Sequence, residues 1–310
     1  HLRIVFLLQL YPLIHTGRHS RYKDIYLHYV ILWKANHLWV GMVEEKTILV
    51  TNDDGVYSPG LRLLYDAVKD LGRVFVVAPE VPKSASGLGL TLHKPLRITK
   101  LILDDMVVYA VNGTPSDIIH LALHVIAKKI DLVVSGINIG DNTSVQVILS
   151  SGTVGAAAQA ALEGIPGIAF SVAVGSAEEL EVNFELQELI KRTVRVFVRE
   201  IIEHGFPEGV DVININFPAE VRKEIKIKVA KAAKLRFTEY VERRVDPRGK
   251  EYFWLYGYPK EPEPNTDVHV VFVEKNIAVT PLKLDLNISV ISEEFVGFVN
   301  NIESFLKSSF

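Results

Sequence analysis

The chain has 310 residues, of which 48% are hydrophobic and 23% are charged, a composition that supports about two globular domains rather than a disordered chain. Its formal net charge of -3 provides no basic field for wrapping nucleic acid, and its unbroken apolar runs are too short to span a membrane. Cysteine is absent, which excludes disulfides, thiolate metal sites and a cysteine nucleophile, and fits a reducing compartment such as the cytoplasm.

Residues 1–41 differ in composition from the rest of the chain. The segment 1–14 is rich in leucine but is interrupted by Gln9 and Pro12, and no small-residue cleavage site of a signal peptide follows it. Met42, the first methionine, stands shortly before the first clean strand. We therefore expect residues 1–41 to be an extension that precedes the folded core.

From residue 46 onward, segments typical of strands alternate with segments typical of helices. Short apolar β-runs are found at 47–51, 74–78, 107–111, 131–135, 168–172 and 210–216. Helical spacing of apolar residues is found at 59–71, 115–129, 153–162 and 178–204. Ser58 suits the N-cap of the first helix and Pro59 its first position. This alternation predicts an α/β fold with a mostly parallel, Rossmann-like sheet and helices on both of its faces.

After residue 217 the chain becomes rich in charged and aromatic β-runs. In chain order, the expected elements are β-rich segments at 225–233 and 236–256, a turn at 246–249, a strand at 277–281 and a terminal helix at 293–306. A β-arm of this kind often packs against a second subunit, although a hairpin that lies on its own core fits the pattern equally well. The expected parts of the chain are the extension 1–41, an α/β core at 42–220, and a C-terminal β-rich arm with a terminal helix at 221–310.

The segment Asn52-Asp53-Asp54-Gly55 directly follows the first predicted strand. Two neighbouring carboxylates can converge in a turn, and they then resist burial unless a cation compensates their charge. A divalent ion is the simplest such cation. A plain Asp-Gly turn explains the same residues equally well when the segment is considered alone.

Polar loops that contain glycine also follow other predicted strands, at 79–91, 112–117 and 135–142, and the segment 151–153 opens an alanine-rich helix. Loops that follow parallel strands emerge at one edge of the sheet, which is where ligands bind in such folds. Carboxylates, hydroxyls and amides are hard oxygen ligands that favour Mg²⁺, Mn²⁺ or Ca²⁺, while helix N-termini favour phosphate. The convergence of these loops therefore predicts metal-assisted phosphoryl chemistry.

Competing motifs are incomplete. Gly55 and Gly60 have the glycine spacing of a P-loop, but no Lys-Ser/Thr pair follows them. The pair Gly87 and Gly89 lacks the third glycine of a dinucleotide fingerprint, which argues against a dehydrogenase.

Several ordered motifs resemble those of the survival protein E (SurE) family, and together they cover about residues 46–290. The motifs that carry the resemblance are Thr51–Gly55, Ala78-Pro79 with Ser84 and Thr91, Gly113–Pro115, Ser135–Asn142, Ser151–Val154, Asp246–Gly249, Thr266-Asp267 and Thr280–Leu282. Members of that family are metal-dependent phosphatases that act on nucleoside monophosphates. They are typically dimeric or larger, with the C-terminal arm exchanged between subunits.

The resemblance implies a set of site residues. The implied metal ligands are Asp53, Asp54, Ser84 and Asn138, where the spacing to Thr91 selects Ser84 over Ser86. Residues implied to lie close to the phosphate are Asn142, Ser151, Gly152 and Thr153. We add Asn52 as a substrate-binding residue and Lys83 as a cation that stabilises developing charge.

The resulting hypothesis is an enzyme that hydrolyses nucleoside 5'-monophosphates with one divalent ion, Mg²⁺ or Mn²⁺, in each subunit. Asp53 and Asp54 would be its catalytic residues, and a homodimer or homotetramer would form through the C-terminal arm. We expect neither a nucleic-acid duplex nor a membrane as a partner. The alternative hypothesis is a nucleotide-binding or sensor module without turnover.

Overall fold

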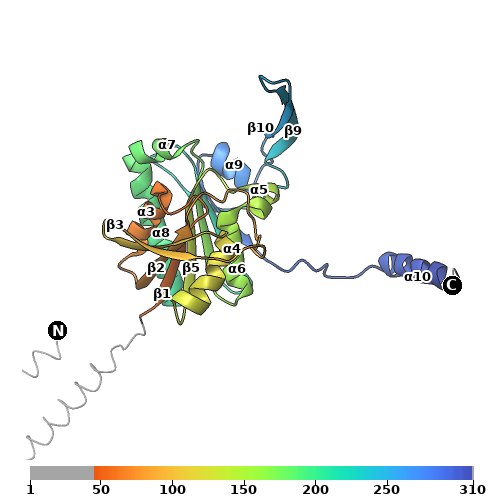
Figure 1. Cartoon of the computed structure of the whole chain (residues 1–310), viewed down its shortest axis with the longest axis horizontal. Helices are drawn as coiled ribbons and strands as arrows, with labels where there is room; N and C mark the ends of the chain where they lie inside the picture. Colours follow the sequence, from red (N-terminus) through yellow and green to blue (C-terminus); the bar gives the residue numbers. More distant parts are fainter. Residues whose placement is uncertain (1–44, 309–310) are drawn as a thin grey trace, which may run out of the picture. The chain divides into compact units, whose positions relative to one another are not determined.

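The structure is a computed structural model that describes residues 45–308, so the predicted extension at 1–41 lies outside the described residues (Figure 1). Its centre is a nine-stranded sheet with the strand order β3-β4-β2-β1-β5-β6-β7-β11-β8. The strands of this sheet are β1 (Thr47–Thr51), β2 (Arg73–Pro79), β3 (Ile98–Leu103), β4 (Met106–Val111), β5 (Leu132–Ile139), β6 (Gly167–Val172), β7 (Val212–Phe217), β8 (Ile227–Val229) and β11 (Ile277–Leu282). All neighbouring pairs are parallel except β3 with β4 and β11 with β7. The predicted α/β fold with a mostly parallel sheet is confirmed.

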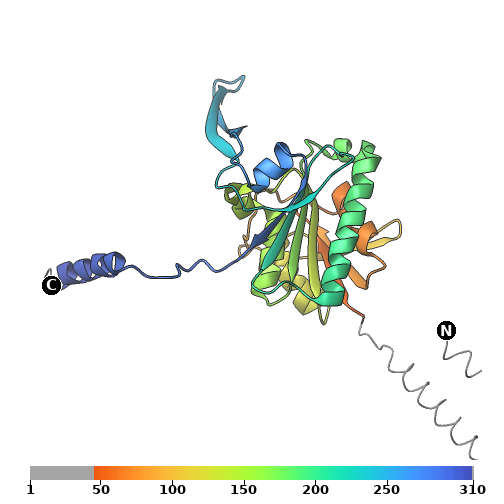
Figure 2. The same ribbon diagram turned by 180° about the vertical axis from the view of Figure 1, so that it is seen from behind.

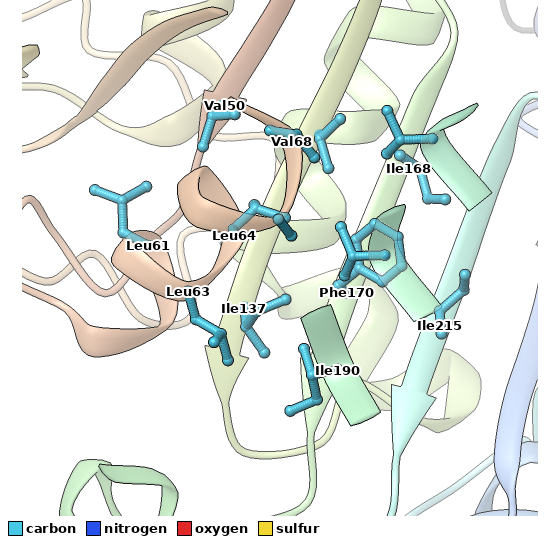
Figure 3. Packing of buried hydrophobic residues seen from close by; sticks show 14 of the residues in the cluster. Val50, Leu61, Leu63, Leu64, Val68, Ile137, Ile168, Phe170, Ile190 and Ile215 are labelled. Atoms are coloured by element: carbon cyan, nitrogen blue, oxygen red, sulfur yellow. The ribbon is translucent and has the colours of Figure 1, made fainter. Parts of the chain in front are cut away.

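Helices cover both faces of the sheet because adjacent strand residues point to opposite sides. In β1, Ile48 and Val50 pack in the core that also contains residues of α3 (Pro59–Val68), α7 (Ala177–Val182) and α8 (Phe184–His204). Leu49 packs on the other face with residues of α4 (Pro115–Leu121) and α6 (Gly152–Leu162). Figure 3 shows side chains of α3, β5, β6 and α8 gathered around Phe170 in the first of these cores.

The start of α3 is fixed as the sequence predicts. Ser58 is the N-cap, and its Oγ accepts a hydrogen bond of 3.2 Å from the backbone N–H of Gly60. Gly60 also allows α3 to approach β5 closely, because a Cβ at this position would lie 2.0 Å from the carbonyl oxygen of Ile137. The start of α3 is therefore fixed shortly after the loop that carries Asp53.

Several elements differ from the sequence-based expectation. The predicted helix at 178–204 is divided into α7 and α8 at Asn183, whose Oδ1 caps α8 by accepting a 3.1 Å hydrogen bond from the N–H of Leu186. The predicted helix at 115–129 is α-helical only to Leu121 and then forms a π-helical turn, Ala122–Ile126. The edge strand β3 and the short helix α5 (Ser144–Ser150) were not predicted.

The C-terminal third contributes both to the sheet and to a separate hairpin. β8 and β11 lie in the central sheet, so the expected boundary near residue 220 falls between strands of one sheet. β9 (Phe237–Val245) and β10 (Glu251–Pro259) form an antiparallel hairpin that extends away from that sheet in Figures 1 and 2, with the predicted turn at 246–249 between them. α9 (Asp267–Phe272) precedes β11, and α10 (Glu293–Ser308) ends the described part of the chain.

Within residues 45–308, no single helix is long and apolar enough to cross a membrane. The pair α5 and α6 passes that test together by length and composition, but it is bent by 73° between the two helices.

Candidate active site

The candidate site lies where the loops after β1 and β2, the end of β5 and the beginning of α6 meet. The loop after β1 is closed by Asn52, which is fully buried. Its Nδ2 donates a 3.0 Å hydrogen bond to the carbonyl of Gly55, and its Oδ1 accepts one of 3.2 Å from the N–H of Gly55. Gly55 has a φ of +97°, a backbone conformation that residues with a side chain rarely adopt. Asn52 thus holds the turn in which the two acidic residues stand, rather than presenting a free amide to a substrate.

Asp53 is buried at the N-terminus of α6, with 4% of its surface exposed. The hydroxyl of Thr153 donates a hydrogen bond to its Oδ1. Burial raises the pKa of the Asp53 carboxyl, and hydrogen bonds from Thr153 and from the backbone of Thr153 and Gly152 offset part of that increase.

Asp54 lies beside Asp53 and is only partly buried. Its Oδ2 accepts a 3.1 Å hydrogen bond from the backbone N–H of Ile139. Burial, and then the neighbouring charge of Asp53, raise the pKa of Asp54 to about 6. Across residues 45–308, no basic side chain forms an ion pair with either aspartate. The two converging carboxylates therefore lack a protein cation that would balance their charge.

Asn138 lies beside Thr153, near the end of β5. β5 continues to Ile139, so Asn138 is a strand residue rather than part of the predicted loop. Its Nδ2 donates a 2.8 Å hydrogen bond to the carbonyl of Gly140, and its Oδ1 lies 3.5 Å from Oγ1 of Thr153. The amide is thereby oriented with its oxygen toward the hydroxyl that contacts Asp53.

The loop after β2 carries the next two candidates. The backbone N–H of Lys83 donates a 2.7 Å hydrogen bond to the carbonyl of Asp53, which ties this loop to the acidic turn. Ser84 is exposed, whereas Oγ of Ser86 is buried without a hydrogen-bond partner. A Cβ on Gly152 would lie 2.6 Å from Oγ of Ser86 and 2.8 Å from Oδ2 of Asp53, so these two oxygens border the same small space. Sequence reasoning had set Ser86 aside.

The predicted segment 151–153 forms the first turn of α6. Ser151 is the N-cap, and its Oγ accepts a 3.1 Å hydrogen bond from the N–H of Val154. Its hydroxyl is therefore used within the helix, while Gly152 and Thr153 border Asp53 directly. The positive end of the helix dipole suits an anion at this point, and the N–H groups of Gly152 and Thr153 are directed to the carboxylate of Asp53.

Asn142 is engaged elsewhere, in a buried network of polar side chains. Its Nδ2 donates a 2.8 Å hydrogen bond to Ser171, and its N–H donates one of 2.7 Å to Oδ1 of Asn216. Nδ2 of Asn214 donates a 2.8 Å hydrogen bond to the carbonyl of Asn142. The sequence analysis missed this network, although two asparagines at alternate positions of the apolar run 212–217 indicate a polar contact on one face of a buried strand.

The donor set fits a hard divalent cation. The site brings together two carboxylates without a cationic partner and the amide oxygen of Asn138. In the described part of the chain, no group of three or more His, Asp or Glu side chains has the geometry of a metal site. Few charged ligands and several neutral oxygens are typical of Mg²⁺ or Mn²⁺ sites rather than of zinc sites.

Comparison with known proteins gives a consistent result. Residues 48–239 match the family model of survival protein SurE. The chain is 57% identical over 269 residues to the 5'-nucleotidase SurE of Hyperthermus butylicus, covering 86% of this chain and 95% of that protein. It is 54% identical over 256 residues to the 5'-nucleotidase SurE of Thermofilum pendens, covering 83% of this chain and 97% of that protein.

A solved structure shares the fold as well. The crystal structure of the SurE protein from Aquifex aeolicus superimposes with a TM-score of 0.66 at 36% sequence identity. The match covers 83% of this chain and 99% of that chain.

Proposed function

The chain belongs to the survival protein SurE family, and on this basis we propose that it is a 5'-nucleotidase, which releases phosphate from nucleoside 5'-monophosphates in a metal-dependent reaction. The observation that carries the proposal is the pair Asp53 and Asp54, placed without a cationic partner at the N-terminus of α6. The names of the relatives favour turnover over a nucleotide-binding module without turnover.

We assign the metal site to one Mg²⁺ or Mn²⁺ ion in each subunit. Asp53 and Asp54 would supply its charged ligands and Asn138 a neutral one. Ser84 remains the second neutral ligand that the family resemblance implies. A divalent ion at this position supplies Lewis-acid activation of water and of the phosphoryl group.

Other groups of the protein would bind the phosphoryl oxygens and accept the proton of the attacking water. The positive end of the α6 dipole would stabilise the phosphoryl oxygens, and the ammonium group of Lys83 would approach them from the loop after β2. Oδ2 of Asp54 is held by the N–H of Ile139. This leaves its Oδ1 to accept the proton of the attacking water, which would displace the nucleoside in line and without a covalent intermediate. The P–O bond to the nucleoside breaks as the new P–O bond forms, and the departing oxygen gains a proton from solvent or from the protonated Asp54.

Removal of divalent ions is expected to abolish turnover. The unaltered protein, supplied with Mg²⁺ or Mn²⁺, should release phosphate from a panel of nucleoside 5'-monophosphates, and EDTA should lower the rate by at least about a hundredfold. The assay is a phosphate-release measurement, with excess metal added back after EDTA as the control. Equal rates with and without EDTA would contradict metal dependence, and binding of nucleotides without any release would support the sensor module instead.

We further propose that the protein assembles as a homodimer or homotetramer through its C-terminal arm. Exposed apolar side chains lie on both faces of the β9–β10 hairpin, with Phe253 (58% exposed) and Leu255 (88% exposed) on one face and Trp254 (58% exposed) on the other. Leu255 and Phe253 stand opposite Val241 and Arg243 in the register of the hairpin. Exposed apolar side chains gathered in this way are typical of a surface that is covered in an assembly.

Leu255→Glu is expected to shift the assembly toward the monomer, because it places a charge among the exposed apolar side chains of the hairpin. Size-exclusion chromatography with light scattering measures the mass of the assembly, with the 34.7 kDa chain mass as the monomer reference. Lys250→Glu at the tip of the hairpin is the control, because it also introduces a glutamate into the hairpin but does not replace an apolar side chain. A monomeric unaltered protein, or a variant with an unchanged mass, would contradict the role of the arm.

A further inference from the structure

Ser86 is a buried hydroxyl at the site that no hydrogen bond within the described residues satisfies. Buried polar groups of folded proteins are nearly always paired, so an unpaired one next to a binding site points to a missing partner. Among the other hydroxyls near the site, Thr153 donates to Asp53, Ser151 caps α6, and Ser84 is exposed. Ser86 is thus the buried hydroxyl at this point that is left for a ligand.

The loop around Ser86 is held firmly against α5 and α6. The N–H of Gly87 donates a 3.0 Å hydrogen bond to the carbonyl of Ser150, and the N–H of Gly89 donates one of 2.9 Å to the carbonyl of Ser86. A Cβ on Gly155 would lie 2.2 Å from the carbonyl oxygen of Gly87, so the loop backbone touches the helix directly. Together with the hydrogen bond from the N–H of Lys83 to the carbonyl of Asp53, these contacts fix the backbone on both sides of Ser86.

The space that Ser86 faces adjoins the carboxylate that would hold the metal ion. It is bordered by Gly152 and by Oδ2 of Asp53, and it lies at the first turn of α6, a helix of 11 residues. Ser86 offers a hydrogen-bond donor in this space, so a phosphoryl oxygen of a substrate that binds beside Asp53 would accept the Ser86 hydroxyl.

We propose that Ser86 binds the substrate, donating its hydroxyl to a phosphoryl oxygen held at the N-terminus of α6, while Ser84 serves the metal ion. This inference rests on the proposed function and adds a residue to its phosphate site. It separates the roles of two serines that stand two positions apart in one loop.

Ser86→Ala and Ser84→Ala form the matched pair that tests the proposal. Calorimetry with inorganic phosphate in saturating Mn²⁺ is expected to show about tenfold weaker phosphate binding for Ser86→Ala, the loss typical of one hydrogen bond to a charged group. Electron paramagnetic resonance titration with Mn²⁺ alone should give the same metal affinity for Ser86→Ala as for the unaltered protein. Ser84→Ala should show weaker Mn²⁺ binding instead.

Ser86→Cys retains the size of the side chain but donates a hydrogen bond only weakly, so a similar loss of phosphate binding in this variant excludes a packing effect. Unchanged phosphate affinity in both Ser86 variants would overturn the proposal, and so would a loss of Mn²⁺ affinity equal to the loss of phosphate affinity. If the unaltered protein bound neither Mn²⁺ nor phosphate, the proposed function itself would fail, which is a distinct result.

Discussion

Asp53→Asn is expected to lower the rate of phosphate release from a nucleoside 5'-monophosphate by at least about a thousandfold while the protein stays folded. The substitution retains the shape of the side chain and can keep the hydrogen bond with Thr153, but it removes one of the two charges at the site. A divalent ion would then be held by a single carboxylate, and its affinity and its effect on the reaction would both fall.

The same substitution is expected to leave the stability of the metal-free protein unchanged or to raise it. Asp53 is 4% exposed and its pKa is raised, so its charged form is less favourable in the folded protein than in the unfolded one. Removing a buried charge that has no cationic partner relieves this cost and also the repulsion that Asp54 experiences.

Thermal unfolding in EDTA and a phosphate-release assay in excess Mn²⁺ measure the two effects separately. Asp104→Asn is the control, because the Asp104 side chain is 93% exposed and lies in the turn between β3 and β4. The control should behave as the unaltered protein in both assays. If Asp53→Asn kept more than about a tenth of the turnover, the assigned role of Asp53 would be wrong.

The fold was predicted well where local patterns and tertiary contacts agree. The buried runs of β1, β2 and β6 and the Ser58-Pro59 start of α3 are confirmed. The division of the helix at 178–204 was missed because the apolar spacing continues across it, with both Leu180 and Leu186 buried. β3 was missed because it is an edge strand whose residues are half-buried or exposed, so it lacks the apolar run of the central strands.

The sequence predicted which loops meet at the site, but not which side chains in those loops point inward. That Asp53, Asn138 and Thr153 meet follows from parallel topology, since each stands at or just beyond the same edge of the sheet. Whether Ser84 or Ser86 turns inward depends on Ala85, which has a φ of +57°. A residue of this type rarely adopts that conformation, so spacing in the sequence could not indicate it.

Gly152→Ala is expected to reduce turnover by at least about a hundredfold, because the space at the start of α6 has no room for a methyl group. The added Cβ would lie 2.8 Å from both Cβ and Oδ2 of Asp53. Cβ of Asp53 is fixed by the backbone of the acidic turn, so either α6 or that turn must shift. A shift of either one separates the helix N-terminus from the carboxylate that it faces.

The effect on stability should be much smaller than the effect on activity, because two contributions oppose each other. Alanine favours a helix over glycine by about 1 kcal/mol, whereas overpacking at Asp53 costs about 1–3 kcal/mol. Gly297→Ala in α10 is the matched control, since a Cβ there meets nothing within 4 Å, and it should retain full activity. Steady-state kinetics with Mn²⁺ would contradict the close approach of α6 to Asp53 if Gly152→Ala and Gly297→Ala had the same kcat/KM.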